Sequence, residues 1–142
     1  MSEADKVTGK CLCGAVRFTA TAKSHDVSAC HCSMCNRWSG GISMFLGAEG
    51  APQFEGADNI SLYRSSDLGE RGFCKVCGSS LFWRVAGQDQ YALAAGVLDD
   101  QSRLRFATEI FIDDKPAYYD FANDTIKQSG EEAMAAFAGE KA

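Results

Sequence analysis

The chain has 142 residues, of which 46% are hydrophobic and 11% aromatic, and its formal net charge is -5. This length and composition suit a single folded domain with a hydrophobic core and exclude an intrinsically disordered chain. The negative net charge argues against general binding to nucleic acid or to an anionic membrane, since both need a basic surface.

Short runs of β-branched and aromatic residues between turn residues predict a mostly β domain with antiparallel sheets. The first strand is expected at 15–22. Further strands are expected at 42–48, 60–65, 79–86, 91–98 and 104–112. Helix is confined to a turn after Cys32 and a short C-terminal helix over 129–140, for which Ser129 is the predicted N-cap.

The ten N-terminal residues, MSEADKVTGK, carry both signs of charge and are followed by no apolar run. No segment of the chain approaches the roughly 20 apolar residues that cross a bilayer. We therefore expect no secretory signal, no membrane association and a cytoplasmic location.

Seven cysteines form three clusters, which are Cys11 with Cys13, Cys30 with Cys32 and Cys35, and Cys74 with Cys77. Disulfides are the simplest alternative, but the odd count, the expected absence of export and the tight spacing favour metal ligation.

The first and last clusters share a glycine after the second cysteine, Gly14 or Gly78. Glycine permits the sharp turn that a chain makes after a metal ligand. Four thiolates complete a tetrahedral zinc shell, so the two pairs predict one structural zinc site. The alternative, buried apolar cysteines, does not explain the paired spacing. The four predicted ligands are Cys11, Cys13, Cys74 and Cys77.

The remaining trio, Cys30, Cys32 and Cys35, has the ligand number of a reactive zinc site with one open position. Two alternatives stay open, a closed site completed by His25 or His31 and a metal-free nucleophilic thiol. His31 lies between two ligands and would point away from them in an extended segment, whereas His25 could reach.

Three thiolates leave a divalent zinc ion with a net negative charge, which makes it poor at activating water and better matched to a soft ligand such as a thiol. A free thiol with a pKa near 8.5 is only about 3% ionised at pH 7, so coordination could raise its thiolate population roughly thirty-fold. The predicted chemistry is addition of a thiol to a small carbonyl, or the reverse cleavage of a carbon–sulfur bond.

Four segments occur in the order seen in one family: GKCLCGAVRF, CHCSMCNRWSGG, RGFCKVCGSSLFW and EIFIDDKPAYYD. From about residue 8 to about residue 124, the chain resembles the glutathione-dependent formaldehyde-activating enzyme family, also called the centromere-protein-V domain. All seven cysteines fall on its pattern.

The resemblance implies an Mss4-like fold, or β-tent, in one domain over residues 1–142. It also implies two zinc ions per chain, one on the four-cysteine site and one on the trio, which is the catalytic centre and is expected to be partly empty after purification. The implied activity is that of a carbon–sulfur lyase, an S-(hydroxymethyl)glutathione synthase that joins formaldehyde to glutathione in a monomer or homodimer.

Substrate contacts are weaker predictions. Trp38 follows the trio and is expected either to line its pocket or to pack in the core. Arg37 is a candidate partner for the glutathione carboxylates, as are Arg71 and Arg84, although each is more often a solvated surface residue. Two other functions remain open: a non-catalytic zinc module that binds a protein, and a thiol redox enzyme of the methionine-sulfoxide reductase type.

Overall fold

The structure, a computed structural model, describes residues 5–141. The chain divides into two compact units, a first unit of Met1–His25 with Phe45–Leu104 and a second unit of Asp26–Met44 with Arg105–Ala142. Strands β2 (Arg17–Cys30) and β3 (Ser43–Ala48) contribute residues to both units.

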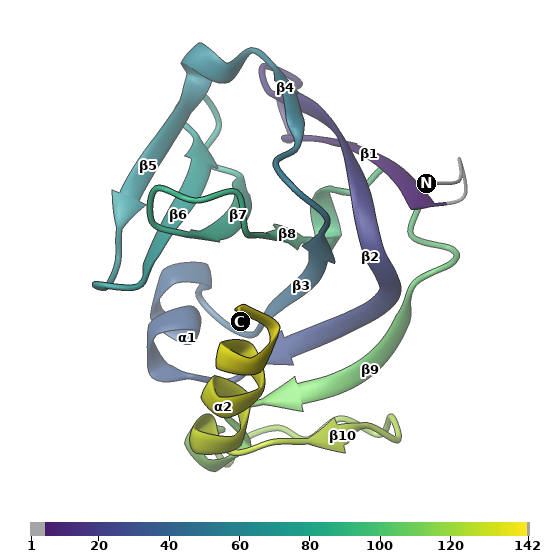
Figure 1. Ribbon diagram of the computed structural model, residues 1–142, viewed down its shortest axis with the longest axis vertical. Helices are drawn as coiled ribbons and strands as arrows, with labels where there is room; N and C mark the ends of the chain where they lie inside the picture. The colour runs from purple at the N-terminus through teal and green to yellow at the C-terminus, as the bar shows by residue number, and fades with distance from the viewer. Residues whose placement is uncertain (1–4, 142) are drawn as a thin grey trace. The chain divides into compact units, whose positions relative to one another are not determined.

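The first unit is built from antiparallel strands. Besides parts of β2 and β3, it contains β1 (Lys6–Lys10), β4 (Gln53–Glu55), β5 (Ile60–Arg64), β6 (Gly69–Cys74), β7 (Ser80–Val85) and β8 (Tyr91–Ala94). β1 and β4 both pair with the start of β2. A second series of pairs runs β3–β8–β7–β6–β5, in which β5, β6 and β7 lie side by side in Figure 1.

Strand β6 was absent from the predicted elements because two glycines interrupt its pattern. A Cβ atom added at Gly69 would lie 2.2 Å from the Trp83 ring, and one added at Gly72 would lie 2.3 Å from the Phe82 ring. These glycines let the rings on β7 lie against the backbone of β6, where any side chain would collide with them.

The core of the first unit combines leucines with a cluster of aromatic rings. The fully buried leucines are Leu46, Leu81 and Leu93. Phe54 contacts the rings of Phe18 and Phe82 at centroid distances of 6.0 and 5.6 Å, and Phe82 contacts Tyr91 edge-on at 4.9 Å. This core fixes β7, which leads out of the hairpin that carries the last cysteine pair.

The second unit pairs the end of β2 with β9 (Arg105–Ile110) and β9 with β10 (Ile126–Lys127), and both pairs are parallel. Figure 1 shows β9 following the end of β2. Parallel pairing differs from the antiparallel sheets predicted from sequence. A parallel pair needs a long connection, and here the first unit forms most of it, since Phe45–Leu104 lies between the two strands in sequence.

Two helices belong to the second unit, α1 (Ser33–Ser39) and α2 (Gly130–Lys141). The predicted N-cap of α2 is confirmed, because Ser129 Oγ accepts a hydrogen bond from the Glu132 N–H at 3.1 Å and Glu132 Oε1 accepts one from the Ser129 N–H at 2.8 Å. This reciprocal pair is a capping box. Neither helix, within residues 5–141, has the length and apolar character needed to cross a membrane.

The predicted strands are confirmed near their expected positions, with two differences. β2 continues eight residues beyond the predicted end at 22, because β9 pairs with its second half. β8 ends at Ala94, where a 3-10 turn at Ala95–Val97 replaces the rest of the predicted strand. The mostly β architecture with a short C-terminal helix is the one expected from sequence.

Candidate metal centres

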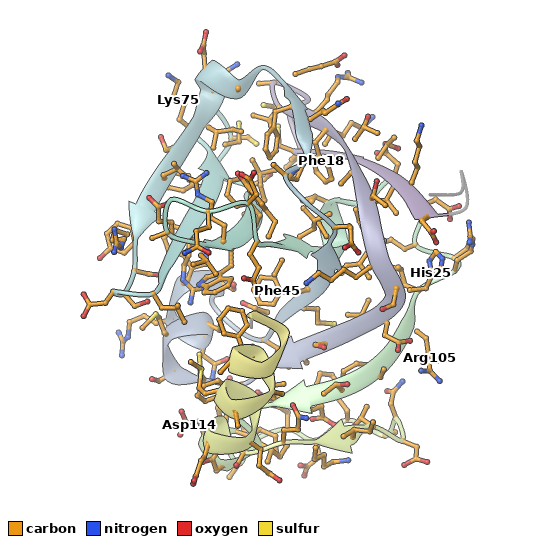
Figure 2. All side chains as sticks on the ribbon, viewed as in Figure 1. Phe18, His25, Phe45, Lys75, Arg105 and Asp114 are labelled. Carbon is orange, nitrogen blue, oxygen red and sulfur yellow. The ribbon has the colours of Figure 1, made fainter. Side chains whose placement is uncertain are left out.

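The structure gathers the seven cysteines into the same two groups that the sequence spacing predicted. Within each group all the sulfur atoms lie within 4.8 Å of one another. The four-cysteine group lies entirely in the first unit, and the trio lies entirely in the second. Figure 2 shows the side chains of both units on the ribbon, with Lys75 marking the turn between the last two cysteines.

The four-cysteine group has the dimensions of a zinc site. The Sγ atoms of Cys11 and Cys13 are 3.7 Å apart, and those of Cys13 and Cys74 are 3.9 Å apart. Zinc–sulfur bonds of about 2.3 Å in a tetrahedron place the sulfurs about 3.8 Å apart. The donor set and its spacing therefore fit a closed tetrathiolate zinc site.

Backbone and hydroxyl groups support these sulfurs. The Val16 N–H donates to Cys11 Sγ at 3.3 Å, and the Cys77 N–H donates to Cys74 Sγ at 3.5 Å. The Ser79 hydroxyl lies 3.2 Å from Cys77 Sγ and lowers the pKa of Cys77 to about 5. Such donors stabilise thiolates over thiols, as metal ligation requires.

The trio is held by the junction of β2 and α1. Cys30 ends β2, Cys32 is the N-cap of α1, and Cys35 lies in the first turn of that helix. The Cys35 N–H donates to Cys32 Sγ at 3.3 Å. Cys30 and Cys35 are buried while Cys32 is partly exposed, so solvent reaches the group at Cys32.

The three sulfurs share negative charge unequally. Hydrogen bonds from the thiols of Cys30 and Cys35 lower the pKa of Cys32 well below its usual value. The same contact with Cys32, followed by contact with Cys35 and burial, raises the pKa of Cys30. The lowered pKa favours the thiolate at the partly exposed Cys32, and the raised pKa favours the thiol at the buried Cys30. Three converging sulfurs are a donor set that suits zinc.

Neither histidine belongs to the trio's group of potential ligands. His31 is fully buried, and its Nε2 lies 2.8 Å from Glu109 Oε1 while its Nδ1 lies 2.6 Å from the Tyr119 hydroxyl. His25, labelled in Figure 2, belongs to the first unit, where its Nε2 accepts a hydrogen bond from Arg103 at 3.0 Å. Among the described residues, no His, Asp or Glu closes the trio.

The predicted substrate contacts differ in their placement. Trp38 is half-buried three positions after Cys35 on α1, whereas Arg37 is exposed two positions after it. Residues three apart share a helix face and residues two apart do not, so Trp38 is the better placed of the two.

The other two candidate arginines lie in the first unit. Arg71 is buried and donates to Ser65 Oγ at 3.1 Å. Arg84 donates to Glu70 at 3.0 Å and to the Tyr91 hydroxyl at 2.9 Å. Both have structural partners within that unit.

Sequence analysis did not single out Glu109 or Tyr119, the two hydrogen-bond partners of the His31 ring. Glu109 is only 1% exposed on β9, and its Oε2 accepts a hydrogen bond from Thr125 Oγ1 at 2.6 Å. A signal was available, since a single carboxylate interrupts the otherwise uncharged run FATEIFI. An isolated acid in a strand that reads as buried calls for a buried partner.

Comparison with known proteins agrees with this geometry. The family model for the glutathione-dependent formaldehyde-activating enzyme matches residues 6–114. A Schizosaccharomyces pombe protein named as an uncharacterized lyase is 34% identical over 127 residues, covering 89% of this chain and 93% of its own. A Halomonas elongata protein named as a putative glutathione-dependent formaldehyde-activating enzyme is 32% identical over 83 residues, covering 52% of this chain and 53% of its own.

A crystal structure of a Rhodobacter sphaeroides protein superposes with a TM-score of 0.56 at 24% identity, covering 65% of this chain and 87% of that one. This likeness supports the fold, and the family match covers most of the chain, including all seven cysteines. The chain belongs to the glutathione-dependent formaldehyde-activating enzyme family.

Proposed function

We propose that this protein is a zinc-dependent carbon–sulfur lyase that joins a thiol such as glutathione to formaldehyde or a related small aldehyde, and that also catalyses the reverse cleavage. The observation that carries the proposal is the trio of Cys30, Cys32 and Cys35, three converging sulfurs that no further described residue closes. Family membership and the names of the two relatives support the same reaction class.

A zinc ion held by the trio would supply a soft Lewis acid that favours the ionised form of a thiol substrate. The chain's own part is to hold the three sulfurs on a rigid junction, with Cys30 fixed by β2 and Cys35 by α1. Cys32 is the partly exposed member, so the substrate thiol is expected to approach beside it.

The reaction balances without an added redox partner. In the forward direction the thiol sulfur bonds to the aldehyde carbon, the carbonyl electron pair moves to oxygen, and the thiol proton ends on that oxygen. Ionising the thiol contributes about 2 kcal/mol at pH 7, so the larger share of any acceleration must come from holding the two reactants together.

The test is the rate of adduct exchange between formaldehyde and glutathione, measured by NMR exchange spectroscopy with metal-loaded protein. Cys32→Ser is expected to return the rate to that of the uncatalysed reaction. Ser33→Ala, which alters the exposed neighbour of Cys32, is the matched control and is expected to keep the wild-type rate. Equal rates for Cys32→Ser and wild type would overturn the proposal.

A second candidate function is a zinc module that binds a protein without catalysis. It is favoured by the apolar tips of the first unit's cysteine turns, where Leu12 is 90% exposed and Val76 is 62% exposed. This function predicts that wild-type protein leaves the exchange rate unchanged, so the same assay distinguishes the two.

A further inference from the structure

A chain of hydrogen bonds in the second unit is centred on two buried side chains, His31 and Glu109. It runs from Thr125 through Glu109 and His31 to Tyr119, with successive distances of 2.6, 2.8 and 2.6 Å. His31 and Glu109 are 0% and 1% exposed, so water cannot replace the bond between them, and the half-buried Thr125 and Tyr119 supply their outer partners. A buried polar group left without its partner costs about 1–3 kcal/mol, and more if it is charged. The four side chains therefore hold one arrangement.

The chemistry of the chain fixes the direction of each bond. An ionised carboxylate only accepts, so Glu109 accepts from Thr125 Oγ1–H and from His31 Nε2–H. In the neutral ring, His31 Nδ1 is then the acceptor for the Tyr119 hydroxyl. Lys127 Nζ, 3.7 Å from Glu109 Oε2, is a further positive partner of the carboxylate.

His31 transmits this arrangement to the cysteines because it stands between Cys30 and Cys32. Its backbone N–H donates to the Ile110 carbonyl at 3.1 Å, directly after Cys30 pairs with Ile110 in the parallel ladder. Both the ring and the backbone of His31 are thus attached to β9. A displaced ring would shift the Cα positions that place two of the three sulfurs.

Tyr119 is itself held in place by contacts with Lys115. Lys115 Nζ donates to the carbonyls of Pro116 and Tyr119, forms an ion pair with Asp120 at 2.9 Å, and lies 4.8 Å from the Tyr119 ring centroid. The loop at 115–120 is closed around this one ammonium group. These contacts fix the position from which the Tyr119 hydroxyl bonds to His31.

We propose that Glu109 and Tyr119 are positioning residues of the trio, which hold His31 so that Cys30 and Cys32 keep the spacing a metal ion needs. The proposal rests on the proposed function in taking the trio as metal ligands. It adds two residues, from β9 and from the loop that follows it, that contribute no ligand. Partners that directly hydrogen-bond a metal ligand change metal affinity by about 10–100-fold when they are removed, which sets the upper bound for residues that act through His31.

The test is competition for Zn²⁺ between the full chain and a chromophoric chelator, which resolves the affinities of the two sites. Tyr119→Phe removes one oxygen and is expected to weaken the trio site about 10-fold, while Glu109→Ala weakens it up to about 100-fold. Glu109→Gln keeps an acceptor for His31 and is expected to recover part of the loss. The four-cysteine site is expected to keep its affinity in every variant.

Co²⁺ substitution provides a second readout, because the thiolate-to-cobalt absorption reports the geometry of the two cysteine groups and not the stability of the fold, and these variants alter only the surroundings of the trio. Its band is expected to shift in Tyr119→Phe. Glu70→Gln, which alters an acid paired with Arg84 in the first unit, is the control and is expected to leave both readouts unchanged.

The outcomes separate this inference from the proposed function. Wild-type affinity and an unshifted band in both Tyr119→Phe and Glu109→Ala would overturn the positioning role while leaving the lyase proposal intact. Weaker binding in these variants, in a protein that shows no adduct exchange, would support the positioning role and overturn the lyase. A wild-type chain that binds only one Zn²⁺ would overturn both. If Glu109→Ala does not fold, Tyr119→Phe decides the matter alone.

Discussion

Two C-x-x-C turns in this protein begin alike and end differently. In the turn from Cys74 to Cys77, the Cys77 N–H donates to Cys74 Sγ at 3.5 Å, and the next residue, Gly78, donates to the Cys74 carbonyl at 2.7 Å. In the turn from Cys32 to Cys35, the corresponding distances are 3.3 and 3.0 Å, with Asn36 in the place of the glycine.

The residue after the second cysteine separates the two. Gly78 has a φ of +81°, so the chain reverses and continues into β7, whereas after Cys35 the chain stays helical through α1. The sulfurs of Cys74 and Cys77 lie beside a second pair, Cys11 and Cys13, and the four form a closed group. The sulfurs of Cys32 and Cys35 lie beside that of Cys30 alone. The same local motif thus belongs to a closed group of four sulfurs or to an open group of three, according to what the tertiary fold places opposite it.

The sharpest way to break this comparison is to remove one buried sulfur from the closed group. Cys74→Ser is expected to lower the free energy of unfolding by about 4 kcal/mol or more, because a structural metal site contributes its binding energy to folding. Urea denaturation of metal-loaded protein measures this loss. A variant as stable as wild type would show that the closed group carries no structural metal.

The matching change in the open group is Cys32→Ser. We expect the unfolding free energy to change by no more than about 1 kcal/mol, since Cys32 is partly exposed, while the metal content falls from two to one per chain. Urea denaturation combined with elemental analysis tests both halves. A stability loss as large as that of Cys74→Ser would make the two sites equivalent and refute the distinction.

Alkylation of the metal-depleted trio sharpens the comparison further. Because its pKa is lowered, Cys32 stays a thiolate as the pH falls, while the raised pKa of Cys30 keeps that thiol protonated. Within the trio, iodoacetamide is therefore expected to modify Cys32 first, at a rate that is nearly constant from pH 8 to 6. An ordinary thiol with a pKa near 8.5 slows roughly 75-fold over that range. Mass spectrometry locates the modified residue, and first labelling of Cys30 would contradict the prediction.

Alanine in place of the residue that follows each turn is expected to change the stability of the fold differently in the two cases. Gly78→Ala is expected to destabilise by about 1 kcal/mol, because its φ of +81° strains any residue with a Cβ. Asn36→Ala is expected to be neutral or stabilising by up to about 1 kcal/mol, since alanine favours helix and the buried Asn36 Oδ1 has no hydrogen-bond partner among the described residues. Thermal unfolding measures the melting temperature of each variant. Equal changes in the two variants would contradict the different backbone conformations after the two turns.

The smallest effect concerns acid stability of the second unit. Burial opposes ionisation of Glu109, but hydrogen bonds from Thr125 and His31 outweigh it and hold the pKa of Glu109 below its usual value. A carboxyl with a lowered pKa in the fold adds stability above its unfolded pKa and loses it as the pH falls through the folded one. Stability is therefore expected to fall below about pH 4, less steeply in Glu109→Gln. The urea concentration at the unfolding midpoint measures this for wild type and Glu109→Gln. The same fall with pH in both proteins down to pH 3 would contradict the prediction.

Much of the candidate site was predictable because metal-binding cysteines occur in pairs only a few residues apart in the sequence. The pairs at Cys11 and Cys74, each with a following glycine, predicted one closed group, and the structure brings those sulfurs together. The N-cap at Ser129 was likewise local, and so was the helical turn after Cys32. Such features depend on residues within a few positions of each other, where backbone geometry alone decides what can meet.

The rest was decided by tertiary structure. The parallel pairing of β2 with β9 joins segments far apart in sequence, and the bond from His31 to Glu109 spans 78 positions. No periodicity in either strand specifies that partner, because a parallel ladder depends on where the long connection returns the chain. The spacing of the cysteines determined which sulfurs form each group. The fold supplied what spacing could not, a buried acid 78 positions away that holds His31 turned away from the trio, in the direction that an extended segment predicts.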